Sequence, residues 1–358
     1  MKDNKKARLI AFYLPQYHPI PENDKWWGKG FTEWTNVTKA KPMFRGHHQP
    51  NLPSELGFYD LRVPETRQAQ ADLAQEHGIE GFCYWHYWMG DGKLLLERPL
   101  REVVQTGRPD YPFCVAWANH TWSGVWCGED KRILVEQFYQ GKQDYINHFY
   151  YLLEAFTDTR YITIDSKPFF MVFRGYELPE PRLFIDTFQE LAIKEGLKGL
   201  HLVGGGIDPD RAKEVGFDAS TYSHHRKVET IHSNRLHRKL YHRYQNIFNR
   251  PIVFSYKKAM KYFLKPGPAP INEYPSLIPN WDTTPRLQER AVILKGGTPE
   301  LFRKHVRDGI FKVVHKPWEH RILFVKSWNE WAEGNYIEPD HRFGRQYLEV
   351  LKDEIKAG

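Results

Sequence analysis

The stretch Arg321–Glu330 reads RILFVKSWNE, an apolar run that gives way to aromatic and hydrogen-bonding side chains. A continuous apolar run of this length is typical of a β-strand that is buried on both faces. Seven further stretches have the same character. They are Arg8–Gln16 (RLIAFYLPQ), Ile79–Trp88 (IEGFCYWHYW), Pro112–His120 (PFCVAWANH), Pro168–Gly175 (PFFMVFRG), Gly199–Gly206 (GLHLVGGG), Phe217–Ser223 (FDASTYS) and Pro275–Asp282 (PSLIPNWD).

Helical stretches lie between several of these runs. Pro64–His77 starts with a proline suited to a first helical turn and is followed by Gly78, a common helix stop. Asp144–Phe156 and Arg182–Lys194 have amphipathic spacing, and Thr298–Asp308 begins with a Thr-Pro-Glu capping signal. Alternating strands and helices predict an α/β fold. Eight such units favour a closed (β/α)8 TIM barrel over an open doubly wound sheet.

The length of 358 residues suits a single (β/α)8 domain, residues 1–358, with long loop insertions. Residues 19–61 follow the first strand and are rich in Trp, Gly, Pro and His, and a loop this long is usually functional. Residues 224–270 form a second insertion, between strands 6 and 7, in which Asn234–Asn249 is predicted to be helical. The window 224–265 has eleven Lys and Arg and one acid, a net charge of +10, whereas the whole chain carries +7.

The composition disfavours secreted and membrane-spanning proteins. The charged N-terminus runs into the first strand without an apolar signal region. No run reaches the roughly 18–20 apolar residues that cross a bilayer. Cys83, Cys114 and Cys127 match no zinc pattern and are too few for a disulfide framework, which favours reduced thiols in a cytosol. We therefore expect a cytoplasmic protein.

The predicted strand ends carry aromatic and hydrogen-bonding residues. Active sites of (β/α)8 barrels lie at the carboxyl ends of the strands, and indole faces stack on the C–H faces of sugar rings. The pattern therefore predicts a sugar-binding cleft. The candidates for substrate binding are Tyr13, Gln16, His18, Trp85, His86, Trp88, Trp117, Asn119, Trp122, Trp281, Trp328 and Asn329. The same strand ends carry Tyr17, His120, Arg174, Tyr222, His224, Asn280, Asp282 and Trp331.

Glu330 and Glu333 follow the eighth strand three residues apart, so both carboxylates can point into one cavity. Cleavage of a glycosidic bond needs two carboxyl groups. Neighbouring carboxylates also separate their pKa values, which keeps one of them protonated near neutral pH. We predict that both are catalytic, with the flanking tryptophans as a low-dielectric wall. The alternative is that they cap a helix and pair with Arg342 or Arg345.

Five histidines, His18, His47, His48, His86 and His120, are predicted near the barrel mouth. No HExxH motif and no His-x-His pair with a matching acid accompanies them. We therefore expect no metal and no other cofactor, and a neutral histidine that donates to a sugar hydroxyl is the simpler role. No GxSxG motif supports a Ser-His-Asp hydrolase.

Six stretches of the chain form a specific set of motifs. They are YLPQYHP (13–19), WWGKGFTEWTNV (26–37), GHHQPNLPSELGFYDLR (46–62), GFCYWHYW (81–88), PNWDTTPR (279–286) and SWNEWAEGNYIEPD (327–340). Over about residues 8–347 the chain closely resembles the WbsX family, bacterial proteins labelled as glycosyltransferases of polysaccharide clusters. It is also similar to glycoside hydrolase family 99, the endo-α-1,2-mannosidases. These motifs add Trp27, Glu33, Trp34 and Tyr336 to the candidate substrate-binding residues.

The resemblance implies a (β/α)8 barrel and distinct roles for the two glutamates. In the mannosidases a W-N-E-W-x-E-G motif carries both catalytic carboxylates, and here it reads WNEWAEG. The resemblance implies that Glu330 is the base at the sugar 2-hydroxyl and Glu333 the acid/base at the glycosidic oxygen. It also implies a retaining mechanism, in which the 2-hydroxyl attacks the anomeric carbon to form a 1,2-anhydro sugar. The third strand departs from the pattern, since it reads WANHTW where many relatives have an acid near His120.

We predict a carbohydrate-active enzyme that cleaves an α-glycosidic bond with retention. The alternative is a glycosyltransferase or transglycosylase that builds a bacterial surface polysaccharide such as O-antigen. The expected partner is an oligo- or polysaccharide, which a lipid could carry. Three roles stay open for the basic segment 226–265: contact with a membrane surface, a solvated basic face, or contact with another protein. We expect no nucleic acid, because no nucleic-acid-binding motif accompanies the charge.

Overall fold

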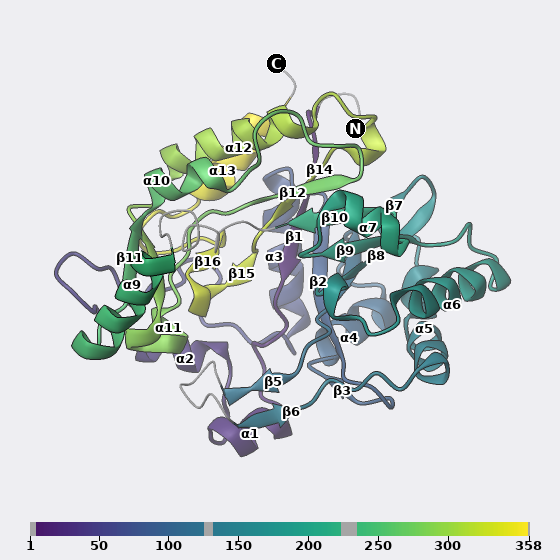
Figure 1. Cartoon of the computed structure of the whole chain (residues 1–358), viewed down its shortest axis with the longest axis horizontal. Helices are drawn as coiled ribbons and strands as arrows, with labels where there is room; N and C mark the ends of the chain where they lie inside the picture. The colour runs from purple at the N-terminus through teal and green to yellow at the C-terminus, as the bar shows by residue number, and fades with distance from the viewer. Residues whose placement is uncertain (1–4, 125–131, 223–234, 357–358) are drawn as a thin grey trace.

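The computed structural model describes residues 5–124, 132–222 and 235–356 (Figure 1). Eight parallel strands close into a barrel, in which β1 pairs with both β2 and β14. In ring order they are β1 Arg8–Tyr13, β2 Gly81–Trp88, β4 Phe113–Trp117, β8 Lys167–Val172, β9 His201–Gly205, β10 Ala219–Tyr222, β12 Glu273–Leu277 and β14 Ile322–Val325. Each overlaps one of the eight predicted runs. The predicted (β/α)8 TIM barrel is therefore confirmed.

Helices surround this barrel (Figure 1). The outer ones are α3 Pro64–Glu76, α4 Arg98–Thr106, α5 Lys142–Phe156, α6 Pro181–Lys194, α7 Pro209–Val215, α12 Pro299–Val313 and α13 Gln346–Ile355. The four predicted helices are confirmed as α3, α5, α6 and α12. The side chain of Thr298 accepts the Leu301 N–H and caps α12, as its sequence signal indicates. Among the described residues, no helix has the length and apolarity needed to cross a membrane.

The residues of each strand alternate between the barrel interior and the surrounding helices. In β1, Phe12 stacks on Phe324 of β14 inside the barrel, with ring centroids 4.9 Å apart. The next residue, Tyr13, faces outward, and its hydroxyl donates to Gln70 Oε1 of α3 at 2.6 Å. This alternation decides which aromatic side chains of the strand ends reach the interior.

The segment 19–61 lies over the carboxyl ends of the strands. It contains α1 (Pro21–Trp27) and α2 (Glu33–Lys39). Trp34 of α2 packs on Trp331 with ring centroids 5.6 Å apart, so the segment contacts the turn that carries the two glutamates.

The second segment, 224–270, is described from residue 235 onward, so His224, Arg226 and Lys227 lie outside the described residues. The helix predicted over 234–249 is confirmed as α9. The remaining strands and α-helices are α9 Arg235–Phe248, α10 Tyr256–Ala259, α11 Thr284–Leu287, β3 Leu94–Leu95, β5 Trp122–Ser123, β6 Ile133–Val135, β7 Thr163–Ile164, β11 Ile252–Ser255, β13 Val292–Lys295, β15 Asn329–Glu330 and β16 Asn335–Tyr336. Within the segment 224–270, β11 pairs with β13, and this pairing places the segment beside α11 (Figure 1).

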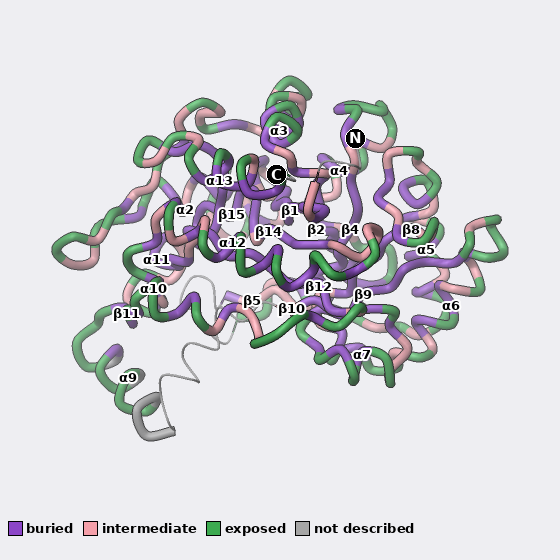
Figure 2. The backbone as a smooth tube through the Cα atoms, turned by 90° about the horizontal axis from the view of Figure 1, so that it is seen from above, coloured by how far each residue is buried: buried purple, intermediate pink, exposed green. Residues whose placement is uncertain are grey.

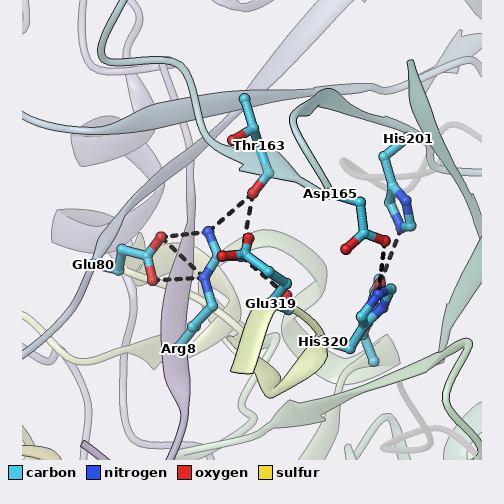
Figure 3. Close-up of polar contacts among 8 residues, drawn as sticks. Arg8, Glu80, Thr163, Asp165, His201, Glu319 and His320 are labelled. Atoms are coloured by element: carbon cyan, nitrogen blue, oxygen red, sulfur yellow. Dashed lines mark hydrogen bonds and ion pairs between the residues drawn. The ribbon is translucent and has the colours of Figure 1, made fainter. Parts of the chain in front are cut away.

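At the amino ends of the strands, Arg8 holds several elements together (Figure 3). Its guanidinium donates to Glu80 Oε1 at 2.7 Å and to Glu80 Oε2 at 2.9 Å. It also donates to the backbone carbonyls of Thr163 and Glu319. Its side chain is only 7% exposed, so these acceptors replace the water that burial removes.

A second chain of contacts lies beside Arg8 (Figure 3). The Tyr274 hydroxyl sits between His201 Nε2 at 2.9 Å and His320 Nδ1 at 3.0 Å, and His320 Nε2 contacts Asp165 Oδ2 at 2.9 Å. Burial lowers the pKa of His201 to about 3, so this histidine is neutral. The contacts join β9, β12 and the residues before β14 at the end of the barrel that usually contributes stability.

We expect Arg8→Ala to lower the free energy of unfolding by about 3–5 kcal/mol, because Glu80 then loses the partner that compensates its partial burial. Urea denaturation measures the change. The matched control is Arg62→Ala, which removes a solvent-exposed pair with Asp60 and should cost less than about 1 kcal/mol. Equal losses for the two variants would contradict the stabilising role of Arg8.

Candidate active site

A cavity of about 540 Å³ lies at the carboxyl ends of the barrel strands, a volume in the range of small-molecule and oligosaccharide sites. Its aromatic lining residues are Phe12, Trp27, Phe31, Trp85, Tyr87, Trp122, Phe173, Tyr176, Tyr222 and Trp281. Its charged lining residues are Glu33, Arg174, Arg286, Lys326, Glu330 and Glu333. The cavity thus combines aromatic walls with a compact group of ionisable side chains.

Many of the candidates from the sequence line this cavity. They are Gln16, Trp27, Glu33, Trp85, Trp122, Trp281, Glu330 and Glu333. His120, Arg174 and Tyr222 from the predicted strand ends also line it. The remaining candidates are not among its lining residues. These are Tyr13, His18, Trp34, His86, Trp88, Trp117, Asn119, Trp328, Asn329 and Tyr336.

Strand alternation explains why several candidates lie outside the cavity. Trp85 and Tyr87 of β2 line it, so their neighbours His86 and Trp88 face the helices. His86 Nε2 lies 2.9 Å from Nε2 of His148 on α5, and Trp88 stacks on the same imidazole. Trp117 of β4 likewise packs outward on the helices, beside His148. The sequence placed these residues at the correct strand ends but left open which face of the strand they occupy.

Other candidates outside the cavity support the turn that carries the glutamates. Asn329 is fully buried, and its side-chain amide exchanges two hydrogen bonds with the backbone of Leu14 after β1. The Tyr17 hydroxyl donates to the Asn329 carbonyl. Tyr336 stacks on Trp331 with ring centroids 3.7 Å apart. These contacts fix the backbone of the turn against the end of β1.

A further carboxyl group, Glu338, lies behind the turn and is enclosed by neutral donors. It accepts from Trp331 Nε1 at 2.6 Å, from Gln70 Nε2 at 2.7 Å and from the Tyr59 hydroxyl at 2.9 Å. Burial raises the pKa of Glu338 to about 7, against the lowering effect of these hydrogen bonds. Glu338 is one of the residues that sequence reasoning missed, although it lies within the stretch 327–340.

Glu330 has an environment that favours its protonated form. Its Oε1 accepts from Trp85 Nε1 at 3.2 Å. Burial and the neighbouring Glu333 raise the pKa of Glu330 to about 8, although Lys326 and Arg286 act in the opposite direction. The apolar wall beside it comes from Trp85, whereas Trp328 packs on Phe82 away from the cavity. The pair therefore carries a proton near neutral pH.

Glu333 and Glu33 share one cation, Arg286 of α11. Arg286 donates to Glu333 Oε1 through Nη1 at 2.7 Å and to Glu33 Oε1 through Nε at 3.1 Å. Its Nη2 lies 4.0 Å from Glu330 Oε2. Burial raises the pKa of Glu33, and Arg286 opposes that rise. The alternative partners Arg342 and Arg345 are excluded, because Arg345 pairs with Glu55 and Glu76 and Arg342 lies over Phe343.

Arg286 was missed as a site residue although it ends the motif PNWDTTPR. Its position depends on Asp282, whose Oδ1 accepts the N–H and the hydroxyl of Thr284 at the start of α11. The backbone N–H of Asp282 in turn donates to the carbonyl of Glu333 at 2.7 Å. Gly334 follows with φ 57°, and a Cβ there would lie 2.8 Å from the Asp282 Cβ. The arginine segment and the glutamate turn are thus packed directly together.

The five histidines that sequence placed near the mouth occupy separate environments. His120 lines the cavity, where burial lowers its pKa to about 4. His47 Nε2 contacts Asp282 Oδ2 at 2.8 Å, and His86 faces α5. His18 is buried and His48 is exposed. Within the described parts of the chain, no three His, Cys, Asp or Glu side chains are grouped as metal ligands.

Comparison with known proteins gives both sequence relatives and structural neighbours. A family model described as "Glycosyltransferase WbsX" matches residues 9–351. The WxcX proteins of two strains of Xanthomonas campestris pv. campestris are 35% identical over 354 residues, which is 98% of this chain and 50% of theirs. The chain therefore spans about half the length of the curated relatives it matches.

Two solved structures share the architecture. A GH99 endo-alpha-mannosidase from Bacteroides thetaiotaomicron, in complex with BIS-TRIS-Propane, has a TM-score of 0.56 and 13% identity and covers 97% of this chain and 95% of that one. A glycoside hydrolase-like protein has a TM-score of 0.55 and 16% identity, with 99% and 95% covered. At these identities the likeness shows the barrel fold.

Proposed function

The chain belongs to the WbsX glycosyltransferase family, and on that premise we propose that it cleaves an α-glycosidic bond with retention, through participation of the substrate 2-hydroxyl. The observation that carries this proposal is the carboxyl pair Glu330 and Glu333 beside Arg286 in an aromatic cavity. Two carboxyl groups with different environments are what acid–base cleavage of a glycosidic bond requires. Trp27, Trp85, Trp122 and Trp281 are proposed to stack on sugar rings.

In the proposed first step, Glu330 takes the proton of the 2-hydroxyl while O2 attacks the anomeric carbon. Glu333 donates its proton to the leaving oxygen, and a 1,2-anhydro sugar forms. Water deprotonated by Glu333 then opens the three-membered ring at the anomeric carbon, and Glu330 returns its proton to O2. Two inversions give net retention. Because O2 must attack from the side opposite the leaving group, the substrate class is a 1,2-trans glycoside such as an α-mannoside.

For these roles, the proton that Glu330 and Glu333 share must move from Glu330 to Glu333. Before substrate binds, the raised pKa puts the proton on Glu330, while Glu333 pairs with Arg286 at 2.7 Å. A substrate 2-hydroxyl that donates to Glu330 favours the ionised form of that group. The proton then passes to Glu333 along the hydrogen bond between the two carboxyl groups. The pKa of about 8 therefore belongs to the pair as a unit.

The second candidate function is transfer of the sugar to an acceptor hydroxyl in polysaccharide synthesis. The description of the matching family favours it. The same anhydro intermediate serves both reactions, and an acceptor hydroxyl replaces water in the second step. A product analysis on a defined α-linked oligosaccharide, with and without an acceptor glycan, tests both. Reducing sugar alone indicates hydrolysis, a lengthened glycan indicates transfer, and an unaltered substrate with every α-linked glycan would refute the proposal.

We expect kcat/KM to fall as pH rises through about 8, the pKa of Glu330. Below that pH the pair keeps the proton that the leaving oxygen needs, and above it both carboxyl groups are ionised and no acid remains. The proton also contributes to stability, because the folded pKa lies above the unfolded value. Thermal stability should therefore decline as pH rises from the ordinary carboxyl pKa of 4.5 to about 8, and level off above that pH. A rate profile from acidic to alkaline pH checks this, and a profile that stays flat through this range would contradict the shared proton.

A further inference from the structure

Helix α9 lies at the edge of the molecule, beside β11 (Figure 2), and four of its large apolar side chains form an exposed stripe. Leu240, Tyr244, Ile247 and Phe248 are 54%, 46%, 61% and 60% exposed. Their spacing of four, three and one residues places them on a single face of the helix. Large exposed apolar side chains gathered in this way mark an interaction surface.

Another face of α9 is fixed to the protein. Gln245 is buried and donates through Nε2 to the carbonyl of Glu289 at 3.0 Å. The ring of Tyr241 packs edge-on against Phe254 of β11, with centroids 5.8 Å apart. The helix is therefore held in place while its apolar stripe stays exposed.

Basic residues accompany the stripe. Lys239 and Arg243 are exposed and each comes one position before a stripe residue. Arg250, Lys257 and Lys258 are exposed in the residues that follow. No Asp or Glu occurs anywhere between positions 235 and 265. An amphipathic helix with a basic border is the pattern of helices that lie in the interface of a bilayer.

We propose that α9 docks on an anionic lipid bilayer, with its apolar stripe among the acyl chains and its basic residues at the lipid phosphates. The sequence suggested this contact from charge alone, and the structure adds the apolar stripe that such binding needs. A second copy of the chain fits the surface less well, because two α9 helices would bring like charges together. The bilayer is complementary in both charge and polarity.

The docked helix contacts the segment that joins Arg286 to β13. Gln245 also contacts the carbonyl of Ala291 at 3.4 Å, in the segment that directly follows Arg286. Docking therefore holds the cavity near the bilayer surface. A glycan linked to a membrane lipid would then lie within reach of the cavity. We infer that this is the substrate class, a step that rests on the proposed function.

Vesicle co-sedimentation with the full chain tests the docking. We expect binding to vesicles of phosphatidylcholine mixed with phosphatidylglycerol, little binding to phosphatidylcholine alone, and weaker binding at high salt. Ile247→Ser with Phe248→Ser should weaken the binding at least about tenfold, because the apolar stripe is lost. Lys239→Glu with Arg243→Glu should weaken it to a similar extent or more, at about one kcal/mol for each basic residue removed.

The matched control is Ile193→Ser with Lys198→Glu, an exposed pair on α6 and just after it, on the side of the molecule opposite α9 in Figure 1. It should bind as the wild type does. Absent wild-type binding, or equal binding of the wild type and the Ile247/Phe248 variant, overturns the proposal. The proposal is also overturned if the wild type forms a dimer but binds no vesicles, and the Ile247/Phe248 variant is a monomer. Turnover of a soluble glycan should be equal in all variants, so a wild type that binds vesicles but is inactive refutes only the proposed function.

Discussion

Glu333→Gln is expected to lower kcat on a native glycan by about 10²–10⁴-fold, the usual contribution of a positioned acid–base group. The amide keeps the volume of the side chain, and its oxygen can still accept from Arg286 Nη1, which lies 2.7 Å from the native carboxylate. What the variant loses is the proton for the leaving oxygen. Turnover of an α-linked oligosaccharide measures the effect, and Glu349→Gln, an exposed glutamate on α13, is the control that should retain full activity.

A glycosyl fluoride separates the two glutamates, because fluoride leaves without protonation. With this substrate the first step should recover in Glu333→Gln but stay slow in Glu330→Gln, since activation of the 2-hydroxyl is still needed. Recovery in Glu330→Gln and not in Glu333→Gln would reverse the assigned roles. Full activity of both variants on native glycan would remove the pair from the mechanism.

Arg286→Met is expected to lower kcat/KM by about 10²–10³-fold, because the charge that organises the carboxyl groups is lost. It should also lower the free energy of unfolding by about 3–5 kcal/mol, since Glu33 and Glu333 are left buried without their cation. Kinetics and urea denaturation measure the two effects. Arg211→Met, which removes an exposed pair with Glu214, is the stability control and should cost less than about 1 kcal/mol.

The stability lost in Arg286→Met should depend on pH. Without the cation, the folded-state pKa of Glu33, which burial already raises, moves further above its unfolded value, so the folded state holds its proton over a wider pH range. Stability then increases as pH falls, and the deficit should be smaller at acidic than at alkaline pH. A deficit that is the same at all pH values would mean that packing, and not the unpaired carboxylates, causes the loss.

The barrel and the glutamate pair were readable from local sequence. The run RILFVKSWNE and its seven counterparts predicted all eight strands, because a strand buried on both faces must be apolar throughout. The capping signal at Thr298 predicted the start of α12. Glu330 and Glu333 are three residues apart, so their proximity was also a local property. Their catalytic roles stay a prediction.

Other features of the site depended on contacts between distant residues. The sequence predicted where the strands end but not which side chains point into the barrel. His86, Trp88 and Trp117 were therefore taken as cavity residues, although they face the helices. Tyr87 and Lys326, which line the cavity, were not singled out. Strand facing is set by which side packs on the interior, and an all-apolar strand carries no alternation from which to read it.

By itself, the sequence determined a closed parallel barrel and two carboxyl groups at the end of its last strand. Only the tertiary structure decided that Arg286 lies between Glu33 and Glu333 and that burial raises the pKa of Glu330 to about 8. The physical reason is that periodicity and short spacing are properties of neighbouring residues. Ion pairing and desolvation depend on distances between segments that only folding brings together.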